Sequence, residues 1–311
     1  MSTKNLKRRE FLQTGLKLTT GAMLMGSGAS SLFGASLFGR SNQTIEMVTL
    51  NNKVKMPILG FGTNTLNGAV GQRCVAEAIS LGYSLIDTAK IYGNEESVGR
   101  GIKQSGVEQE KLFVTSKLWV SDAGYENTIK AFHVSLKKLG LEYLDLYLIH
   151  RPRGDFKGSW KAMETLYKEG KIRAIGVSNF KPAQLKSLIA SSDIVPAVNQ
   201  IETHAFFTQE KQYDILYGLG VQHEAWSPLA EGRNSIFSNK TLASIGKKHN
   251  KNNAQVSLRW HYQRGIIAIP RTSQKSHMIE NLNIFDFQLD DSDMQAIAGL
   301  DLNRTQFPEW K

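Results

Sequence analysis

The chain lacks the residue patterns that build disulfides, cysteine- or histidine-based metal centres and dinucleotide-binding loops. Its single cysteine, Cys74, excludes an intramolecular disulfide framework and a cysteine-based zinc site. The seven histidines are scattered without a His-x-His or His-Glu-x-x-His pattern, so we predict no metal centre and disfavour a metal-dependent hydrolase. No Gly-x-Gly-x-x-Gly follows the first candidate strand, because Gly60 and Gly62 have the wrong spacing, which disfavours an open doubly wound sheet.

The excess of basic residues does not indicate a nucleic-acid partner. The formal net charge is +10, but residues 1–29 alone hold five Lys or Arg against one Glu. The remainder has no basic run interleaved with aromatic residues, so we predict a generally basic surface and no nucleic-acid binding. A length of 311 residues with 41% hydrophobic content suits one large α/β barrel.

The first forty residues differ in kind from the rest. Arg8 and Arg9 precede Phe11, and an apolar stretch rich in Gly, Ala, Ser and Thr follows at residues 16–37. This order is typical of a twin-arginine export signal, with small residues suited to cleavage near 27–29. We therefore expect residues 1–40 to be a leader that engages the twin-arginine machinery and directs a periplasmic protein. A disordered basic leader and an uncleaved membrane anchor are the alternatives, and they would leave the protein cytoplasmic or membrane-associated.

From residue 45 the pattern becomes regular and predicts one domain reaching residue 311. Residues 47–50 and 53–56, joined by Asn51-Asn52, predict a β-hairpin with a two-residue turn. Apolar runs then alternate with amphipathic helical stretches, which predicts a closed (β/α)8 TIM barrel of the α/β class, plugged at its N-terminal end by the hairpin. The expected strands are 58–61, 84–86, 112–116, 143–149, 174–177, 197–201, 221–225 and 266–269. The expected helices include 72–81, 97–104, 125–139, 159–168, 183–190, 211–218 and 253–263.

Four polar residues lie at or just beyond the ends of predicted strands: Asp87, Tyr92, Lys117 and His150. The C-terminal ends of barrel strands face one mouth, so we expect the four side chains to meet there. A tyrosine can protonate a developing alkoxide if a neighbouring ammonium brings its pKa closer to neutral. Lys117 can supply that charge, Asp87 can hold Lys117 in place, and His150 can orient a substrate carbonyl.

Each of the four residues also has a purely structural interpretation when it is taken alone. Asp87 could cap the strand–loop junction, and Tyr92 could be a half-buried barrel tyrosine. Lys117 could extend its ammonium from a strand end to solvent, and His150 could be a hydrogen-bonded core residue. Their coincidence at one barrel mouth favours the catalytic interpretation.

The segments around these residues resemble those of aldo-keto reductases, in particular the compact bacterial branch that includes diketogluconate reductases. Residues 85–95 (LIDTAKIYGNE) are similar to the family's Asp and Tyr segment, 115–119 (TSKLW) to its Lys segment, and 148–152 (LIHRP) to its His segment. The similarity runs from about residue 46 to 302. It implies a (β/α)8 barrel, a nicotinamide cofactor bound extended across the mouth before the substrate, and Tyr92 as proton donor.

The resemblance also implies which residues bind the cofactor. Ser178, Asn179 and Gln200 would hold the nicotinamide carboxamide, and Trp226 stands where the family usually has a tyrosine that stacks on the ring. Ser227 and Leu229 would follow the pyrophosphate. The implied set is completed, at the adenosine end and beside the first strand, by Gly62, Thr63, Arg271, Thr272, His277, Glu280 and Asn281. Loop residues such as Gln200 and Asn179 could instead serve only to satisfy backbone groups.

Two departures from the family pattern bear on specificity. The family commonly has Lys and Arg where this chain has Arg271 and His277, so the positive field at the adenosine 2′-phosphate is weaker. NADPH is the expected donor, with NADH as a second one. Arg151 replaces a common Trp and either favours an acidic substrate or, the interpretation we favour from sequence, points outward into an ion pair. Trp119 is expected to form a pocket wall. The segment after Leu302 is short, which predicts a broad, shallow pocket without a lid.

The sequence therefore predicts a monomeric enzyme that reduces a small aldehyde, ketone or keto sugar with NADPH. The alternative is a nicotinamide-binding, redox-sensing subunit that does not turn over, since barrels of this family can regulate membrane channels. The predicted leader argues against a cytosolic channel partner, although it also separates the enzyme from cytoplasmic NADPH.

Overall fold

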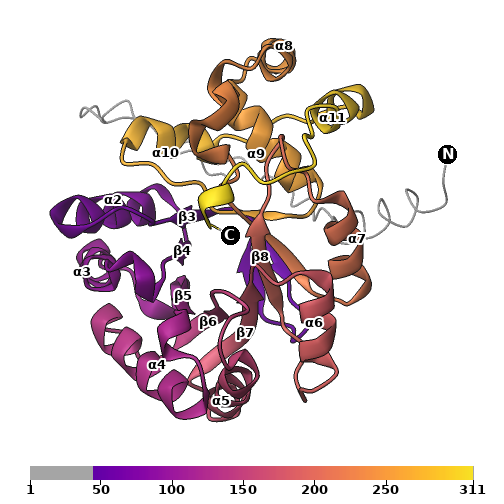
Figure 1. Ribbon diagram of the computed structural model, residues 1–311. Coiled ribbons are helices and arrows are strands. Elements are labelled where there is room, and N and C mark those ends of the chain that lie inside the picture. Colours follow the sequence, from indigo (N-terminus) through magenta and orange to yellow (C-terminus); the bar gives the residue numbers. More distant parts are fainter. Residues whose placement is uncertain (1–44, 311) are drawn as a thin grey trace, which may run out of the picture. The chain divides into compact units, whose positions relative to one another are not determined.

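Eight parallel strands form a barrel whose two edge strands meet. The computed structural model describes residues 45–310. The sheet runs in the order β10-β9-β8-β7-β6-β5-β4-β3, and an isolated parallel bridge between Leu59 and Ala268 joins its two edges (Figure 1). Each expected strand overlaps an observed one, so the predicted (β/α)8 barrel is confirmed. The strands are β3 (Gly60–Gly62), β4 (Leu85–Asp87), β5 (Phe113–Leu118), β6 (Leu144–Ile149), β7 (Ile172–Ser178), β8 (Val198–Glu202), β9 (Gln222–Trp226) and β10 (Ile267–Ala268).

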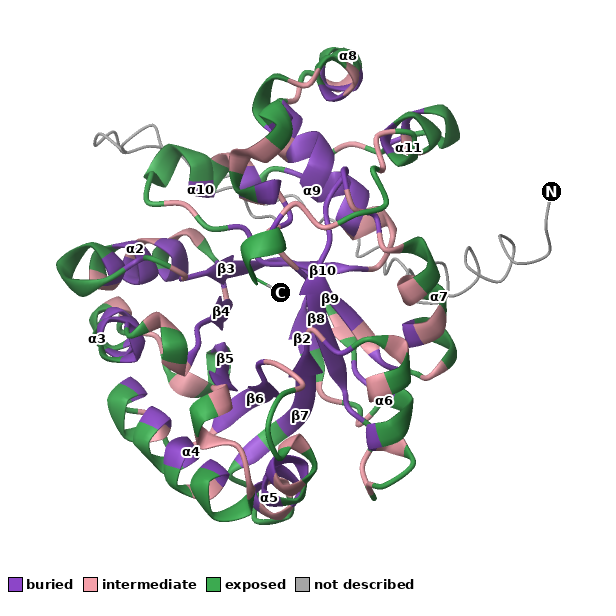
Figure 2. Cartoon of the chain, in the orientation of Figure 1, coloured by how far each residue is buried: buried purple, intermediate pink, exposed green. Residues whose placement is uncertain are grey.

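Helices surround the barrel, and those that pack on it turn a buried face toward the strands and an exposed face outward (Figure 2). In α4 (Tyr125–Leu139), the buried residues Thr128, Phe132, Ser135 and Leu139 recur every three or four positions, the period of one helix face. Gly140 ends this helix with a φ of 66°, a left-handed conformation that glycine adopts without a steric penalty. The other helices that the sequence predicted are α2 (Gly68–Leu81), α3 (Glu95–Ser105), α5 (Phe156–Lys168), α6 (Pro182–Ile189), α7 (Glu210–Gly218) and α9 (Asn253–Gln263).

The N-terminal hairpin lies against the N-terminal ends of the strands, as expected. It pairs β1 (Met47–Thr49) with β2 (Lys55–Pro57), and the Asn51 side chain donates a hydrogen bond to the carbonyl of Pro196, just before β8. The predicted two-residue turn is wrong by one residue. Leu50 bonds Val54 across a three-residue turn whose last residue, Lys53, has a φ of 69°. A turn closed by a left-handed third residue is a common hairpin connection.

Three helices in the last quarter of the chain were not predicted: α8 (Lys240–His249), α10 (Lys275–Leu282) and α11 (Asp291–Ala298). The start of α8 is capped by the Asn239 side chain, which accepts hydrogen bonds from the amides of Thr241 and Leu242. Asp290 caps α11 in the same way. These caps are readable in the sequence, but the helices are short. The apolar residues of α8 and α11 pack in a small second cluster around Trp260, whereas Met278 of α10 belongs to the main core.

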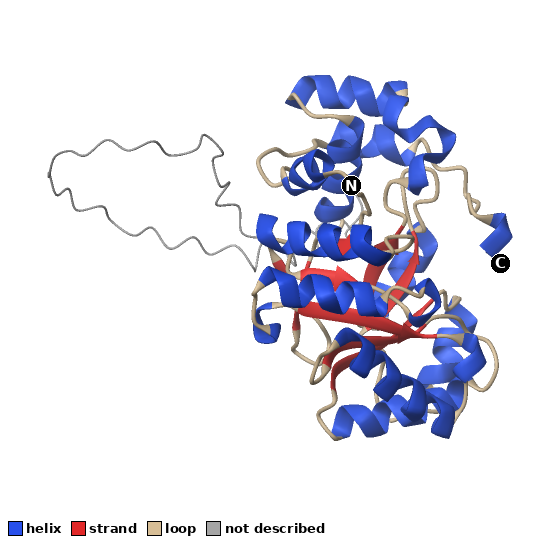
Figure 3. Ribbon diagram, turned by 90° about the vertical axis from the view of Figure 1, so that its left-hand side faces the viewer, coloured by secondary structure: helices blue, strands red, loops and turns tan. Residues whose placement is uncertain are grey.

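The last described residues return to the barrel mouth. The 3-10 helix η5 (Pro308–Trp310) lies on the side toward which the strands point (Figure 3). The twin-arginine leader predicted over residues 1–40 lies outside the described residues. In the part of the chain that the structure describes, no helix combines the length and the apolar character needed to cross a membrane.

Candidate active site

The four residues singled out in the sequence meet at the C-terminal ends of the strands. Asp87 is the last residue of β4, Lys117 lies near the end of β5, and His150 directly follows β6. Tyr92 ends the short 3-10 helix η1 (Lys90–Tyr92) in the loop after β4. Parallel pairing of β4, β5 and β6 sets these strand ends side by side, which brings together residues more than sixty positions apart.

Lys117 is the centre of the group. Its fully buried ammonium donates hydrogen bonds to Asp87 Oδ1 at 2.6 Å and to the Thr88 carbonyl at 2.9 Å. The same nitrogen lies 3.5 Å from the Tyr92 hydroxyl oxygen. The other oxygen of Asp87 accepts a hydrogen bond from the Gln200 amide at 2.9 Å. Hydrogen bonds therefore hold both partners of the ion pair in place. The remaining contact of the Lys117 ammonium is with the Tyr92 hydroxyl.

The pKa of Tyr92 is shifted in the direction opposite to the one expected from the sequence. Burial raises the pKa of the phenol above its ordinary value of 10.0, and the Asp87 carboxylate adds to this, while the Lys117 ammonium opposes both. Lys117 lowers the pKa of this phenol, as predicted, but burial is the larger effect and the net shift is upward. Tyr92 consequently carries its proton at neutral pH, and the nearby ammonium remains placed to stabilise the phenolate once the proton leaves.

His150 is neutral in this site. Burial, with the positive charges of Lys117 and Arg151, holds the pKa of its imidazole well below 6.5. Its ring lies edge-to-face on Tyr92 with centroids 5.9 Å apart, and on Trp119 at 5.2 Å. Its Nδ1 is buried with no hydrogen-bond partner among residues 45–310. A neutral imidazole can orient a substrate oxygen by donating one N–H, but it has no spare proton to give at neutral pH.

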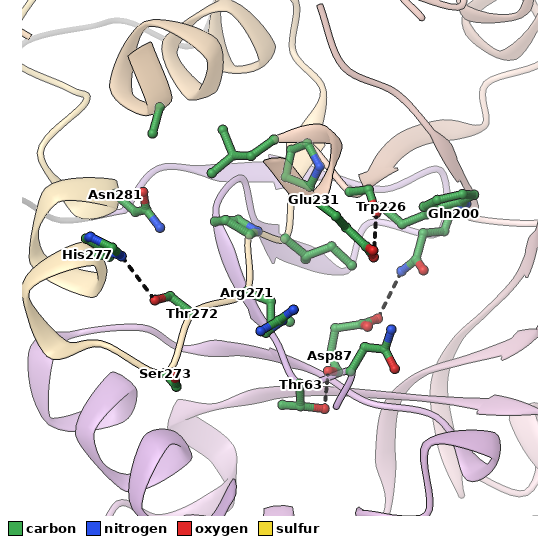
Figure 4. Close-up of a pocket in the computed structure, with 18 of the residues that line it drawn as sticks. Thr63, Asp87, Gln200, Trp226, Glu231, Arg271, Thr272, Ser273, His277 and Asn281 are labelled. Carbon is green, nitrogen blue, oxygen red and sulfur yellow. Dashed lines mark hydrogen bonds between the residues drawn. The ribbon is translucent and has the colours of Figure 1, made fainter. Parts of the chain in front are cut away.

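One cavity of about 650 Å³ contains most of the predicted site (Figure 4). Three predicted residues do not line it. Lys117 acts from beneath Tyr92, Trp119 packs behind His150, and the Ser178 hydroxyl is buried on the Gln200 carbonyl. The predicted residues that do line it are Gly62, Thr63, Asp87, Tyr92, His150, Arg151, Asn179, Gln200, Trp226, Ser227, Leu229, Arg271, Thr272, His277, Glu280 and Asn281.

The C-terminal segment covers part of the mouth, contrary to the sequence expectation. Trp310 lines the cavity and stacks on Trp226 with ring centroids 6.0 Å apart and planes at 22°. Phe307 is buried and packs on the edge of the same indole at 5.2 Å. The Arg151 side chain does not point outward into an ion pair as we favoured, because it lines the cavity and its guanidinium donates a hydrogen bond to the Trp310 carbonyl. Two tryptophans, Trp226 and Trp310, thus form part of the pocket wall.

A further buried carboxyl, Glu224, lies close to the four residues and was not singled out in the sequence. It lies in β9 opposite Gln200 of β8, and strand alternation turns it to the same face as Trp226. Neither of its carboxyl oxygens has a hydrogen-bond partner within the described residues. Burial, reinforced by the Asp87 charge, raises the pKa of Glu224 to about 8. The group is therefore uncharged at neutral pH, which avoids a second buried negative charge beside Asp87.

This raised pKa makes stability depend on pH. The folded chain keeps a proton that the unfolded chain loses above about pH 4.5, so wild-type stability falls as pH rises toward 8. The free energy of unfolding falls by about 1.4 kcal/mol for each pH unit between about 5 and 8, which is on the order of 4 kcal/mol in all. Glu224→Gln should remove this loss, so its stability advantage over wild type should grow from pH 5 to pH 8 in urea unfolding. Glu126→Gln, at an exposed position, is the matched control; equal advantages at both pH values would refute the assignment.

Comparison with known proteins gives the family. Residues 58–302 match the model described as the Aldo/keto reductase family. A glyoxal reductase of Bacillus subtilis (strain 168) is 50% identical over 257 residues, which are 82% of this chain and 92% of that protein. Morphine 6-dehydrogenase of Pseudomonas putida is 44% identical over 269 residues, 82% of this chain and 91% of that protein. The chain belongs to the aldo/keto reductase family.

This aldo-keto reductase is an NAD(P)H-dependent oxidoreductase. A Bombyx mori aldo-keto reductase whose structure was solved in complex with NADP matches it with a TM-score of 0.81 at 34% identity, over 86% of this chain and 97% of that one. The match supports NADP(H) as its cofactor. The site residues provide an independent test of whether that cofactor fits.

The carboxamide end of a nicotinamide fits the hydrogen-bonding groups of the cavity. Gln200 gives its amide N–H to Asp87, which leaves its side-chain oxygen as an acceptor. The Asn179 amide donates to the His150 carbonyl and to Ser178, while its oxygen accepts from the Trp226 indole. Asn179 has a φ of 62°, a left-handed conformation that asparagine tolerates. Because Trp310 stacks on Trp226, a nicotinamide on Trp226 must use the other ring face or displace Trp310.

The phosphate end of the cofactor also fits, and here the cavity includes residues that the sequence did not indicate. Ser227 and Glu231 lie in one loop, and both have left-handed backbone conformations. The Ser227 hydroxyl donates a hydrogen bond of 3.2 Å to the Glu231 carboxylate (Figure 4). Asn252 caps α9 beside this loop, so the positive end of that helix faces the cavity. Arg271 also lines the cavity and is exposed. It has no hydrogen bond or ion pair among residues 45–310, so its guanidinium is available for a phosphate.

Proposed function

We propose that this enzyme reduces small aldehydes and ketones, keto sugars among them, with NADPH and that Tyr92 supplies the proton. One observation carries the proposal. The Lys117 ammonium, held by Asp87 at 2.6 Å, lies 3.5 Å from a half-buried phenol at the wall of the cavity. A structural ion pair has no need of a tyrosine hydroxyl beside it, whereas a proton donor to an alkoxide does.

Each residue then has one task in the reaction. When bound, the reduced nicotinamide supplies a hydride to the carbonyl carbon. The Tyr92 hydroxyl donates its proton to the carbonyl oxygen, and the Lys117 ammonium stabilises the phenolate that is left. Asp87 keeps Lys117 protonated and fixes its position. Neutral His150 donates a hydrogen bond to the same oxygen and orients the carbonyl. The product is the alcohol.

The walls of the pocket support a small substrate. Trp226, Trp310 and His150 surround the space beside Tyr92, and flat aromatic walls suit short aldehydes and dicarbonyls. The glyoxal reductase relative is named for such a substrate, although the morphine dehydrogenase relative is named for a bulky one. We take the monomer as the working unit, since residues of a single chain line the whole cavity described here.

An activity assay tests this function. The full-length protein should oxidise NADPH when glyoxal, methylglyoxal or a small aromatic aldehyde is added, with one alcohol formed for each NADPH consumed. The measurement combines the loss of NADPH absorbance with chromatographic identification of the product. Tight NADPH binding without turnover on any of these carbonyls would instead support the regulatory, redox-sensing alternative.

Cofactor preference should depend on Arg271. Its guanidinium, which has no partner among residues 45–310, suits the adenosine 2′-phosphate, which NADH lacks. Arg271→Leu should raise the KM for NADPH by about 10- to 100-fold, the value of a charge-assisted hydrogen bond. The KM for NADH in the same variant is the internal control and should change by less than about threefold. Equal losses for both cofactors would show that Arg271 does not contact the 2′-phosphate.

We also propose that the Arg8-Arg9 segment directs export of the folded barrel to the periplasm. The supporting observation is the order of the arginine pair, Phe11 and the apolar stretch. Cell fractionation of wild type and of an Arg8→Lys/Arg9→Lys variant tests it. Mature protein in the periplasm for wild type, and retention of the variant in the cytoplasm, is the expected result. Wild type found in the cytoplasm with an intact N-terminus would refute it.

A further inference from the structure

Arg151 lies in the catalytic cavity rather than on the outer surface of the barrel. It follows His150 directly and lines the same cavity as Tyr92, His150 and Trp310. The side chain is half-buried, and its Nη1 donates a hydrogen bond to the Trp310 carbonyl. That bond holds the guanidinium against the C-terminal segment, and the cavity lies beside it.

No negative group in the described part of the chain neutralises this guanidinium. Arg151 forms no ion pair among residues 45–310, and its charged neighbour, Arg153, has the same sign. Asp87, the carboxylate that lies deepest in the cavity, already accepts from Lys117 and Gln200. Glu224 is uncharged at neutral pH. Two further carboxylates line the cavity, Glu231 and Glu280, and they accept hydrogen bonds from Ser227 and Asn252. The Arg151 charge is therefore unpaired among residues 45–310.

The Arg151 charge interacts electrostatically with His150 and Tyr92. Arg151 contributes to the lowering of the His150 pKa, and Tyr92 in turn acts on the Arg151 pKa. A guanidinium has five N–H donors, and only one interaction with the chain is present within the described residues. Taking a half-buried cation out of water without a counter-charge is unfavourable, so an anion that enters the cavity gains affinity there.

We propose that Arg151 binds the carboxylate of the substrate, so that this enzyme prefers aldehydes or ketones that carry a carboxylate over their neutral counterparts. The inference rests on the proposed carbonyl reduction and specifies the substrate class for it. Hydride transfer and proton donation occur as described above, with the carboxylate unchanged, and the product is a hydroxy acid. The carboxylate binds on the same side of the cavity as the carbonyl that His150 orients, since both side chains line that cavity.

Matched acids and esters test the proposal. We would measure kcat/KM with NADPH for 4-carboxybenzaldehyde against methyl 4-formylbenzoate, and for succinic semialdehyde against methyl 4-oxobutanoate. Wild type should prefer the acid in at least one pair. In Arg151→Gln the acid-to-ester ratio for that pair should fall by about 10-fold or more, and Arg151→Lys should restore part of it. Because the ratio is taken within one variant, a general loss of activity cancels.

Arg153→Gln is the matched control. It removes the same charge two positions away from an exposed side chain that does not line the cavity, so its ratio should stay at the wild-type value. Raising salt from about 0.02 to 0.5 M should lower wild-type kcat/KM for the acid more than for the ester, which needs no variant. Equal wild-type activity on acid and ester, or equal losses of the ratio in Arg151→Gln and Arg153→Gln, would overturn the proposal. Absence of turnover on all four compounds would instead refute the reductase function itself.

Discussion

Replacement of Tyr92 by phenylalanine should lower kcat for carbonyl reduction by about 10²- to 10⁴-fold, the range that general acid catalysis contributes. The reason is local. The phenol hydroxyl is the protonated group that lies against Lys117, and the neutral imidazole of His150 has no extra proton to replace it at neutral pH. NADPH affinity should stay within about threefold of wild type, because the ring that lines the cavity is retained. Steady-state kinetics and fluorescence titration of NADPH give the two quantities.

Tyr147→Phe provides the matched control for this experiment. Tyr147 is fully buried in β6, three residues before His150, but its ring packs outward on Phe132 of α4 and does not line the cavity. The variant loses the same hydroxyl from the same strand region, and its kcat should stay near wild type. A Tyr92→Phe enzyme that keeps more than about a tenth of wild-type kcat would mean that another group donates the proton.

Replacement of Lys117 by methionine should have a large effect on stability as well as on activity. Asp87 is fully buried, and without the ammonium its charge keeps only the Gln200 hydrogen bond. Breaking a buried pair by removing one partner typically costs about 3–5 kcal/mol, so the free energy of unfolding should fall by that amount at pH 7. Burial of Asp87 and Lys117 is nearly complete, so solvent does not screen the loss. Urea unfolding with an intact native baseline measures it.

The double variant Asp87→Asn/Lys117→Met separates stability from catalysis. Removing both charges leaves no unpaired ion, so the double variant should recover most of the lost unfolding free energy. It should not recover kcat, because no ammonium then stabilises the Tyr92 phenolate. A Lys117→Met protein within about 1 kcal/mol of wild type would show that the ion pair contributes little to the fold.

The sequence was sufficient to predict the barrel and the position of the reacting groups. Asp87, Lys117 and His150 follow apolar strand patterns, and parallel strands of a barrel end at one mouth, so their convergence follows from topology alone. The turn of the hairpin was harder, because one extra residue at Lys53 changes the connection without changing either strand. The capped helices α8 and α11 were missed because each buries only a few side chains.

What the sequence could not supply depends on burial. The pKa of Tyr92 is raised rather than lowered because the packed barrel removes water from the phenol, and no local pattern reports that. Trp310 is more than 150 residues from His150 in the chain and reaches the mouth through the loop after α11. Glu224 looked like one polar residue in a strand until its register with Gln200 placed it in the interior. Each depends on contacts between distant segments.

The pH dependence of kcat for NADPH-driven reduction of a neutral aldehyde tests the central claim most directly. The proton donor must be in its acid form, so activity is lost as pH rises through the pKa of that donor. With Tyr92 raised above 10.0, kcat should be constant from about pH 6 to pH 9 and fall only at higher pH. A decline with a midpoint between about pH 6 and 7 that persists in Tyr92→Phe would identify a histidine as the donor and contradict the account.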